Sequence, residues 1–166
     1  MSIDFFKKLA SFLAFCLVQV LVLNRIHLFG VATPLLYVYF VLGFRRNYPK
    51  WGLLLWAFAM GVVIDSFSNT PGVAAGSLTF IAALQPYVLA PFVPRDSADD
   101  MRPSLHGMGG APYFYYSLIL VFIYCLLFFS LEMFSFFNWI YWGECILGST
   151  ALIMLLILVL ESVRRN

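Results

Sequence analysis

Residues 61–72 read Gly-Val-Val-Ile-Asp-Ser-Phe-Ser-Asn-Thr-Pro-Gly, and they join two long apolar segments of the chain. Asp65 is the one acid inside the apolar run from Trp51 to Phe67. A carboxylate within a bilayer costs roughly 2.5–3.5 kcal/mol, so an acid kept at such a position indicates a functional or structural site. The polar residues that follow it, and then Pro71-Gly72, predict a tight turn between two helices.

The composition predicts an integral membrane protein. Of 166 residues, 63% are apolar and only 11% are charged, whereas a soluble domain is about 25% charged. Aromatic residues make up 19%, which is typical of a chain that faces lipid and anchors at its interfaces. We therefore expect one all-α domain over residues 1–166, surrounded by membrane lipid and without nucleic acid as a partner.

The cysteines indicate neither a metal site nor a disulfide framework. Cys16, Cys125 and Cys145 all lie inside apolar runs and form no CxxC or Cys/His pattern. We expect them to be buried structural thiols, and we expect no cofactor.

Six apolar segments predict six transmembrane helices. The first resembles the core of a signal peptide, but Asn24-Arg25 follows it rather than a cleavage motif, so we expect a retained helix. The predicted helices cover about residues 5–23, 32–44, 51–67, 77–92, 113–134 and 139–161.

The second segment is short. Residues 32–44 span about 20 Å as a helix, against a hydrocarbon core of roughly 30 Å. A re-entrant hairpin is the alternative, but it would bring Arg45, Arg46 and Lys50 to membrane depth at roughly 7–10 kcal/mol. Spanning with a mismatch costs only fractions of a kcal/mol per Å. We therefore expect segments two and three to cross fully.

The basic residues predict the orientation, because Lys and Arg concentrate on the cytoplasmic side of membrane proteins. With six spans and the N-terminus inside, only Arg25 lies on the outer side. The predicted topology is N-in, C-in. The cytoplasmic side then holds Lys7, Lys8, Arg45, Arg46, Lys50, Arg95, Arg102, Arg164 and Arg165.

No motif indicates an enzyme. The chain contains no GxSxG, HExxH or P-loop pattern, and Glu132 and Glu144 are best explained as a polar edge of the bundle. Residues 94–112 contain Asp96, Asp99, Asp100 and His106, but their spacing matches no calcium loop. We expect a solvated cytoplasmic loop there, with no metal.

Two roles for Asp65 remain open at this level. Ser68, Asn69 and Thr70 offer local hydrogen-bond donors, which favours a carboxylate that caps the helical hairpin. Arg25 is the only predicted outer cation, so an Asp65–Arg25 ion pair is the second hypothesis.

The pattern Gly61-x-x-x-Asp65 followed by Pro71-Gly72 resembles the rod shape-determining protein MreD family. The predicted length, helix number and lack of soluble loops are similar to that family over nearly the whole chain. The resemblance implies a six-helix bundle whose fold is similar to the substrate-binding membrane subunit of energy-coupling-factor transporters.

The resemblance also implies a function. The family provides a non-enzymatic scaffold for the bacterial cell-elongation machinery, which controls rod shape and peptidoglycan synthesis at the cytoplasmic (inner) membrane. The implied partners are a bitopic MreC-like protein and, in the wider assembly, MreB-like filaments, a RodA-type polymerase and a class B penicillin-binding protein. The implied site, for a partner or for the fold, consists of Gly61, Asp65, Asn69, Thr70, Pro71 and Gly72.

Two alternatives accompany this interpretation. Arg45, Arg46 and Lys50 would meet anionic lipid or a cytoskeletal partner, or would only set the topology. The protein as a whole would otherwise be the small-molecule-binding subunit of an energy-coupling-factor type importer, with the Asp65 region lining a pocket.

Overall fold

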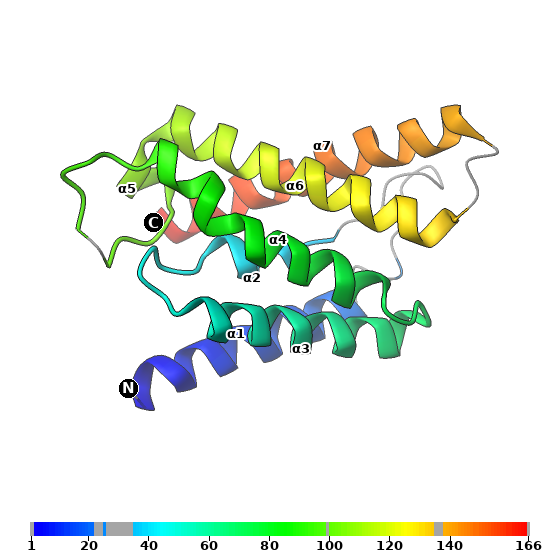
Figure 1. The fold of residues 1–166 in the computed structure, drawn as a ribbon, viewed down its shortest axis with the longest axis horizontal. Coiled ribbons are helices and arrows are strands. Elements are labelled where there is room, and N and C mark those ends of the chain that lie inside the picture. The colour runs from blue at the N-terminus through cyan, green and yellow to red at the C-terminus, as the bar shows by residue number, and fades with distance from the viewer. Residues whose placement is uncertain (1, 22–24, 26–34, 99, 135–137, 166) are drawn as a thin grey trace.

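The computed structural model describes residues 2–21, 25, 35–98, 100–134 and 138–165, and all regular structure within them is helical. Figure 1 shows an elongated bundle whose long helices run roughly along one axis. The long helices are α1 (Ser2–Leu21), α3 (Lys50–Ser68), α4 (Val73–Leu89), α6 (Gly110–Met133) and α7 (Trp139–Arg165). The short ones are α2 (Val38–Leu42), the 3-10 helix η2 (Ala90–Phe92) and α5 (Leu105–Met108).

Four helices of the described chain are long and apolar enough to cross a bilayer: Lys50–Ser68, Val73–Phe92, Gly110–Met133 and Trp139–Arg164. Each approaches or exceeds the 20 residues that a hydrocarbon core of about 30 Å requires. The helix α1 has 20 residues, but Asp4, Lys7 and Lys8 lie in its first two turns. The prediction of an all-helical protein with membrane-spanning helices is thus confirmed.

The second predicted helix is shorter than expected. Of its range 32–44, only Val38–Leu42 is helical among the described residues, and residues 43–44 form a turn. Residues 26–34 lie outside the described part of the chain. The five helical residues rise only about 7.5 Å, yet Tyr37, Val38 and Leu42 are fully buried. The short helix α2 is therefore enclosed by the rest of the bundle.

The other helix boundaries differ from prediction mainly at their N-termini. The helix α4 begins at Val73 rather than at residue 77, because a side chain from α3 caps its first turn, as shown below. The helix α6 begins at Gly110 rather than at residue 113 and tolerates Pro112 in its first turn, where backbone N–H groups have no helical partner. At its other end α7 extends past residue 161 to Arg165.

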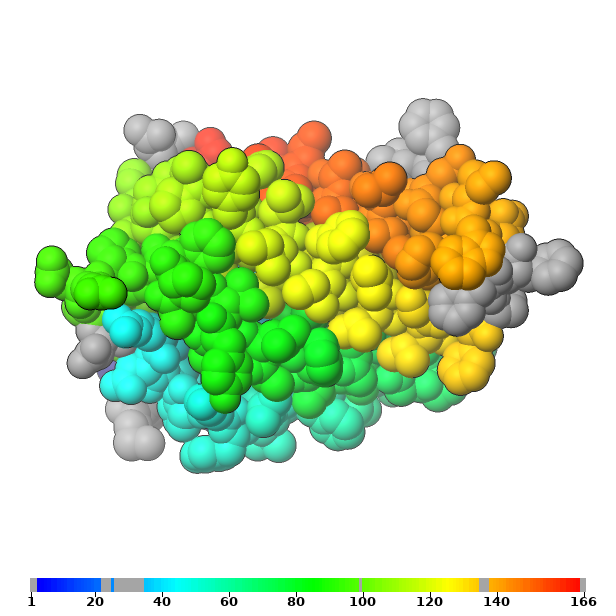
Figure 2. Space-filling view, turned by 45° about the horizontal axis from the view of Figure 1, so that its top comes forward, coloured from blue at the N-terminus to red at the C-terminus, as the bar shows by residue number. Residues whose placement is uncertain are grey.

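Packing follows the order of the chain. The helices α3 and α4 form the most extensively packed hairpin, α4 contacts α6, and α6 contacts α7, while α1 packs against α3. The N- and C-termini lie at the same end of the bundle (Figure 1). Figure 2 shows that side chains of α4, α6 and α7 lie next to one another and cover much of one face of the bundle. The predicted burial of Cys16, Cys125 and Cys145 is confirmed.

Candidate functional site at the turn between α3 and α4

Asp65 lies in the last turn of α3 and is only 6% exposed. Its Oδ1 accepts hydrogen bonds from the backbone N of Ala74 at 2.9 Å and from Thr70 Oγ1 at 3.0 Å. Its Oδ2 accepts from the backbone N of Ala75 at 3.0 Å. Ala74 and Ala75 belong to the first turn of α4. The carboxylate of one helix therefore caps the N-terminus of the next.

The chemistry of a helix N-terminus explains this arrangement. The first N–H groups of a helix have no internal partner, and the helix dipole makes that end favourable for a negative charge. The residue before α4 is Gly72, which has no side chain with which to cap the helix itself. Asp65 supplies the missing acceptor from α3.

Gly61, one turn before Asp65, lets the two helices meet. A Cβ atom at this position would lie 2.3 Å from Cα and 2.6 Å from N of Ala75. No real Cβ makes such contacts, so the backbone of α4 occupies the space that a side chain would need. The Gly61-x-x-x-Asp65 spacing thus places a close helix contact and a cap on the same face of α3.

The turn itself needs two left-handed residues. Asn69 has φ 58°, a conformation that Asn tolerates better than most residues, and its N–H donates to the carbonyl of Asp65. The N–H of Thr70 donates to the same carbonyl at 3.3 Å. Gly72 has φ 83°, which favours glycine. Asn69, Pro71 and Gly72 are exposed, whereas Gly61 and Asp65 are buried.

The predicted ion pair is not formed. The ion pairs among the described residues join Arg45 to Asp4 and Asp100, and Arg164 to Glu161; none joins Arg25 to Asp65. The three hydrogen bonds described above already occupy both carboxylate oxygens of Asp65. The capping hypothesis for Asp65 agrees with the structure.

The predicted basic residues lie at the other end of α3 and have partners within the chain. Arg45 contacts both carboxylate oxygens of Asp100, at 2.9 and 2.8 Å. The backbone N of Arg46 donates to the carbonyl of Met101 at 3.1 Å. Lys50 Nζ donates to Tyr87 Oη at 3.3 Å. The contacts of Arg45 and Arg46 tie the connection between α2 and α3 to the connection between η2 and α5, and the contact of Lys50 joins the start of α3 to α4.

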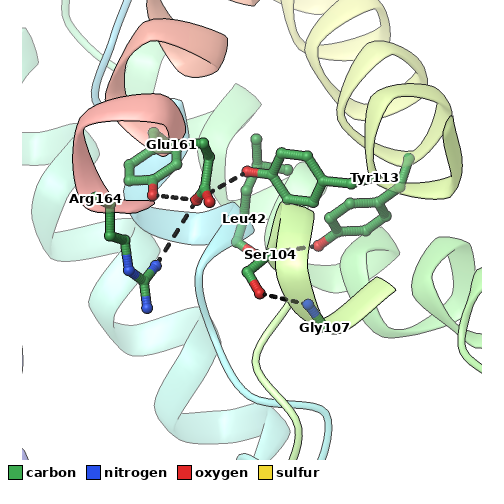
Figure 3. Close-up of polar contacts among 8 residues, drawn as sticks. Leu42, Ser104, Gly107, Tyr113, Glu161 and Arg164 are labelled. Atoms are coloured by element: carbon green, nitrogen blue, oxygen red, sulfur yellow. Dashed lines mark hydrogen bonds and ion pairs between the residues drawn. The ribbon is translucent and has the colours of Figure 1, made fainter. Parts of the chain in front are cut away.

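A second buried acid was missed by the sequence analysis. Glu161 of α7 is 4% exposed, and its Oε1 accepts from Tyr39 Oη at 2.5 Å and from Tyr113 Oη at 3.4 Å. The Nη1 atom of Arg164 lies 3.7 Å from the same oxygen. Figure 3 shows the carboxylate of Glu161 facing Tyr113 and Arg164, with dashed lines marking these contacts. An acid directly after the apolar run of residues 151–160, three residues before an arginine, was the available signal.

Three further side chains explain why α2 is so short. Tyr116 Oη donates to the carbonyl of Leu42 at 3.3 Å, and Gln85 Nε2 lies 3.4 Å from the carbonyl of Phe44. At the other end of α2, Gln19 Oε1 accepts from the backbone N of Leu36 at 3.1 Å. Backbone groups inside a membrane must find partners in the protein. Side chains from α1, α4 and α6 provide them here, so α2 does not need to continue.

Replacing Glu161 by leucine is expected to lower the stability by about 2–4 kcal/mol, since the Tyr39 and Tyr113 hydroxyls and the Arg164 guanidinium lose their acceptor. Glu161→Gln keeps one acceptor oxygen and should cost less. Thermal unfolding in detergent measures both. Glu144→Leu, at an exposed position of the same helix, is the control. Equal stability of the Glu161→Leu and Glu144→Leu variants would contradict this role.

Comparison of the chain with protein-family models, with curated proteins and with solved structures gives no match in any of the three. The fold and the buried capped turn nevertheless define the class. The chain is a helical membrane protein, with four helices able to span a bilayer among the described residues. Two of them, α3 and α4, are joined by hydrogen bonds from the backbone of α4 to the carboxylate of Asp65.

Proposed function

We propose that this protein is a non-enzymatic scaffold of the bacterial cell-elongation machinery, situated in the cytoplasmic membrane, which docks the transmembrane helix of an MreC-like partner. The resemblance of the Gly61–Asp65–Pro71–Gly72 pattern to the MreD family supports this proposal. The arrangement of those residues also supports the proposal. Gly61 and Asp65 are buried and hold the fold, whereas Pro71 and Gly72 are exposed on the surface of the bundle.

The proposal keeps the topology of six spans with both termini inside. The common position of the two termini at one end of the bundle supports an even number of crossings (Figure 1). In this topology α1 and the segment that contains α2 provide the two crossings beyond the four apolar helices. The excess of basic residues at the cytoplasmic side supports the orientation.

The observation that carries the docking role is an open face on α4. Gly72, Gly76, Phe80 and Ala83 recur at helical spacing and are all exposed. A Cβ at Gly76 would have no neighbour within 4 Å, so Gly76 makes no close helix contact within the described bundle. Small residues on a membrane-facing helix let a second helix approach closely. We assign the partner to this face, beside the exposed turn.

An importer subunit is the second candidate, and the site favours it less. Such a subunit needs convergent polar groups around a pocket. The carboxylate of Asp65 is already bonded to Thr70 and α4, and neither of the two cavities considered below is lined by residues of the 61–72 stretch. A small molecule would have to displace the cap of α4 to reach Asp65.

Affinity purification of the tagged protein from its native cells in mild detergent, followed by mass spectrometry, tests the proposal. We expect an MreC-like protein to be recovered, with or without cell-wall synthases. Recovery of a transporter core with paired ATPases would overturn the scaffold function and favour the importer.

Replacing Gly76 by leucine is expected to reduce recovery of the partner at least tenfold, because the larger side chain keeps the partner helix away from α4. The fold should persist, since the position is open and leucine favours a helix more than glycine by about 0.8 kcal/mol. Quantitative co-purification is the measurement. Gly143→Leu on α7, where a Cβ likewise has no neighbour within 4 Å, is the matched control. Equal recovery from both variants would exclude this face as the docking site.

A further inference from the structure

A basic cavity of about 500 Å³ lies at the end of the bundle where α1 begins and α7 ends. Its walls come from α1, from α2 and the turn after it, from Arg102, and from α7. Its cationic lining residues are Lys7, Lys8, Arg45, Arg102 and Arg164, and no carboxylate lines it.

The positive charge of this cavity is only partly balanced by neighbouring acids. Arg45 is held by Asp100 at 2.8 Å, and Arg164 lies 3.7 Å from Glu161. No ion pair to Lys7 or Arg102 is found among the described residues. Lys8 Nζ lies over the ring of Tyr48, 3.3 Å from its centroid, rather than beside an acid. The cavity therefore carries net positive charge, which an anion would neutralise.

A second cavity of about 630 Å³ adjoins the first and shares Lys8, Arg45 and Arg102 with it. Asp4 and Asp100 also line this shared end, and both pair with Arg45. Its wall towards α3 is mainly apolar. Two of its lining side chains are also exposed on the surface of the bundle: Trp51 is 73% exposed and Leu55 is 62% exposed. The apolar lining residues include Phe5, Trp51, Leu55, Trp56 and Ala59.

A charged compartment next to an apolar one has the polarity pattern of a phospholipid. Lys and Arg clusters between helices on the cytoplasmic side of a membrane bind anionic headgroups. The apolar cavity, open towards the exposed face of α3, provides space for an acyl chain. A free inorganic anion would use the first cavity and leave the second without a role.

We propose that the basic cavity binds the phosphate headgroup of an anionic phospholipid, whose acyl chain lies in the adjoining apolar cavity along α3. Lys7, Lys8 and Arg102 contact the phosphate. Arg45, at the boundary of both cavities, is positioned by Asp100.

Native mass spectrometry of the purified full-length protein, titrated with phosphatidylglycerol or phosphatidylcholine in detergent, tests the proposal. We expect saturable binding of phosphatidylglycerol and at least tenfold weaker binding of phosphatidylcholine. The double variant Lys7→Gln/Arg102→Gln should weaken phosphatidylglycerol binding about thirty-fold, the size expected for two cations near an anionic lipid. The matched control Arg46→Gln/Arg95→Gln removes two cations that do not line either cavity, and it should bind normally.

Three outcomes would overturn the proposal. Equal binding of the two lipids would exclude headgroup recognition. Equal losses in the two double variants would indicate only a diffuse attraction of the basic surface. Displacement of the lipid by millimolar inorganic phosphate would assign the cavity to a soluble anion. If Lys7→Gln/Arg102→Gln does not fold, Leu55→Gln in the apolar cavity gives the second test, with weaker lipid binding expected and unchanged binding counting against the acyl-chain position.

Discussion

Replacing Gly61 by alanine is expected to disrupt the α3–α4 hairpin and to destabilise the protein by about 3 kcal/mol or more. The added methyl group would lie 2.3 Å from Cα of Ala75, an overlap that only separation of the two backbones can relieve. That separation would also lengthen the hydrogen bonds from Ala74 and Ala75 to Asp65, which are 2.9 and 3.0 Å long. A change that normally strengthens a helix should here weaken the whole bundle.

Thermal unfolding in detergent and the steady-state amount of protein in membranes measure this effect. Gly76→Ala is the matched control, because it makes the same substitution on α4, at a position where a Cβ meets no atom within 4 Å. We expect Gly76→Ala to be as stable as the wild type or slightly more stable. Wild-type stability of the Gly61→Ala variant would show that the two helices are not in backbone contact.

Replacing Asp65 by alanine is expected to cost about 2–4 kcal/mol, because the buried N–H groups of Ala74 and Ala75 lose their acceptors and Thr70 loses its own. Asp65→Asn should give an intermediate loss, since one amide oxygen can still accept while the NH₂ group faces a donor. Thermal unfolding measures the loss, and hydrogen exchange at Ala74 and Ala75 localises it to the start of α4.

Two controls separate capping from other roles of Asp65. Ser66→Ala changes an exposed neighbour whose hydroxyl donates to the carbonyl of Val62 within the same helix, and it should have little effect. Arg25→Ala should leave the stability unchanged, because no ion pair joins Arg25 to Asp65. A large effect of Arg25→Ala that a charge swap with Asp65 rescues would restore the ion-pair hypothesis. Unchanged hydrogen exchange at the backbone N–H of Ala74 in the Asp65→Ala variant would contradict the capping role of Asp65.

The sequence was sufficient to predict the helical membrane class and the hairpin around Asp65. The apolar run and the Pro-Gly turn predicted α3 to within one residue at either end. Thr70 was predicted as a donor to the carboxylate, and its hydroxyl does donate to it. The backbone bonds from Ala74 and Ala75 were not foreseen, because they depend on the path of the turn, which no side-chain pattern encodes.

The rest of the fold depends on contacts between distant parts of the chain. Glu161 is buried because Tyr39 and Tyr113 surround it, and these partners lie 122 and 48 residues away in sequence. The length of α2 was overestimated, since its unpaired carbonyls are satisfied by Gln85 and Tyr116 rather than by further helical turns. The apolar residues around α2 are compatible with a long helix, and only the tertiary hydrogen bonds distinguish the short one.

We propose that Asp65 holds the fold while the neighbouring open face of α4 holds the partner. A photoreactive phenylalanine analogue in place of Phe80, which is 49% exposed on that face, tests this claim in living cells. The same analogue at Leu155 on α7, which is 58% exposed, is the control. We predict a crosslink from position 80, and not from position 155, to a single-span MreC-like protein. A crosslink from position 80 to a transporter core, or equal crosslinking from both positions, would contradict this assignment of the partner to α4.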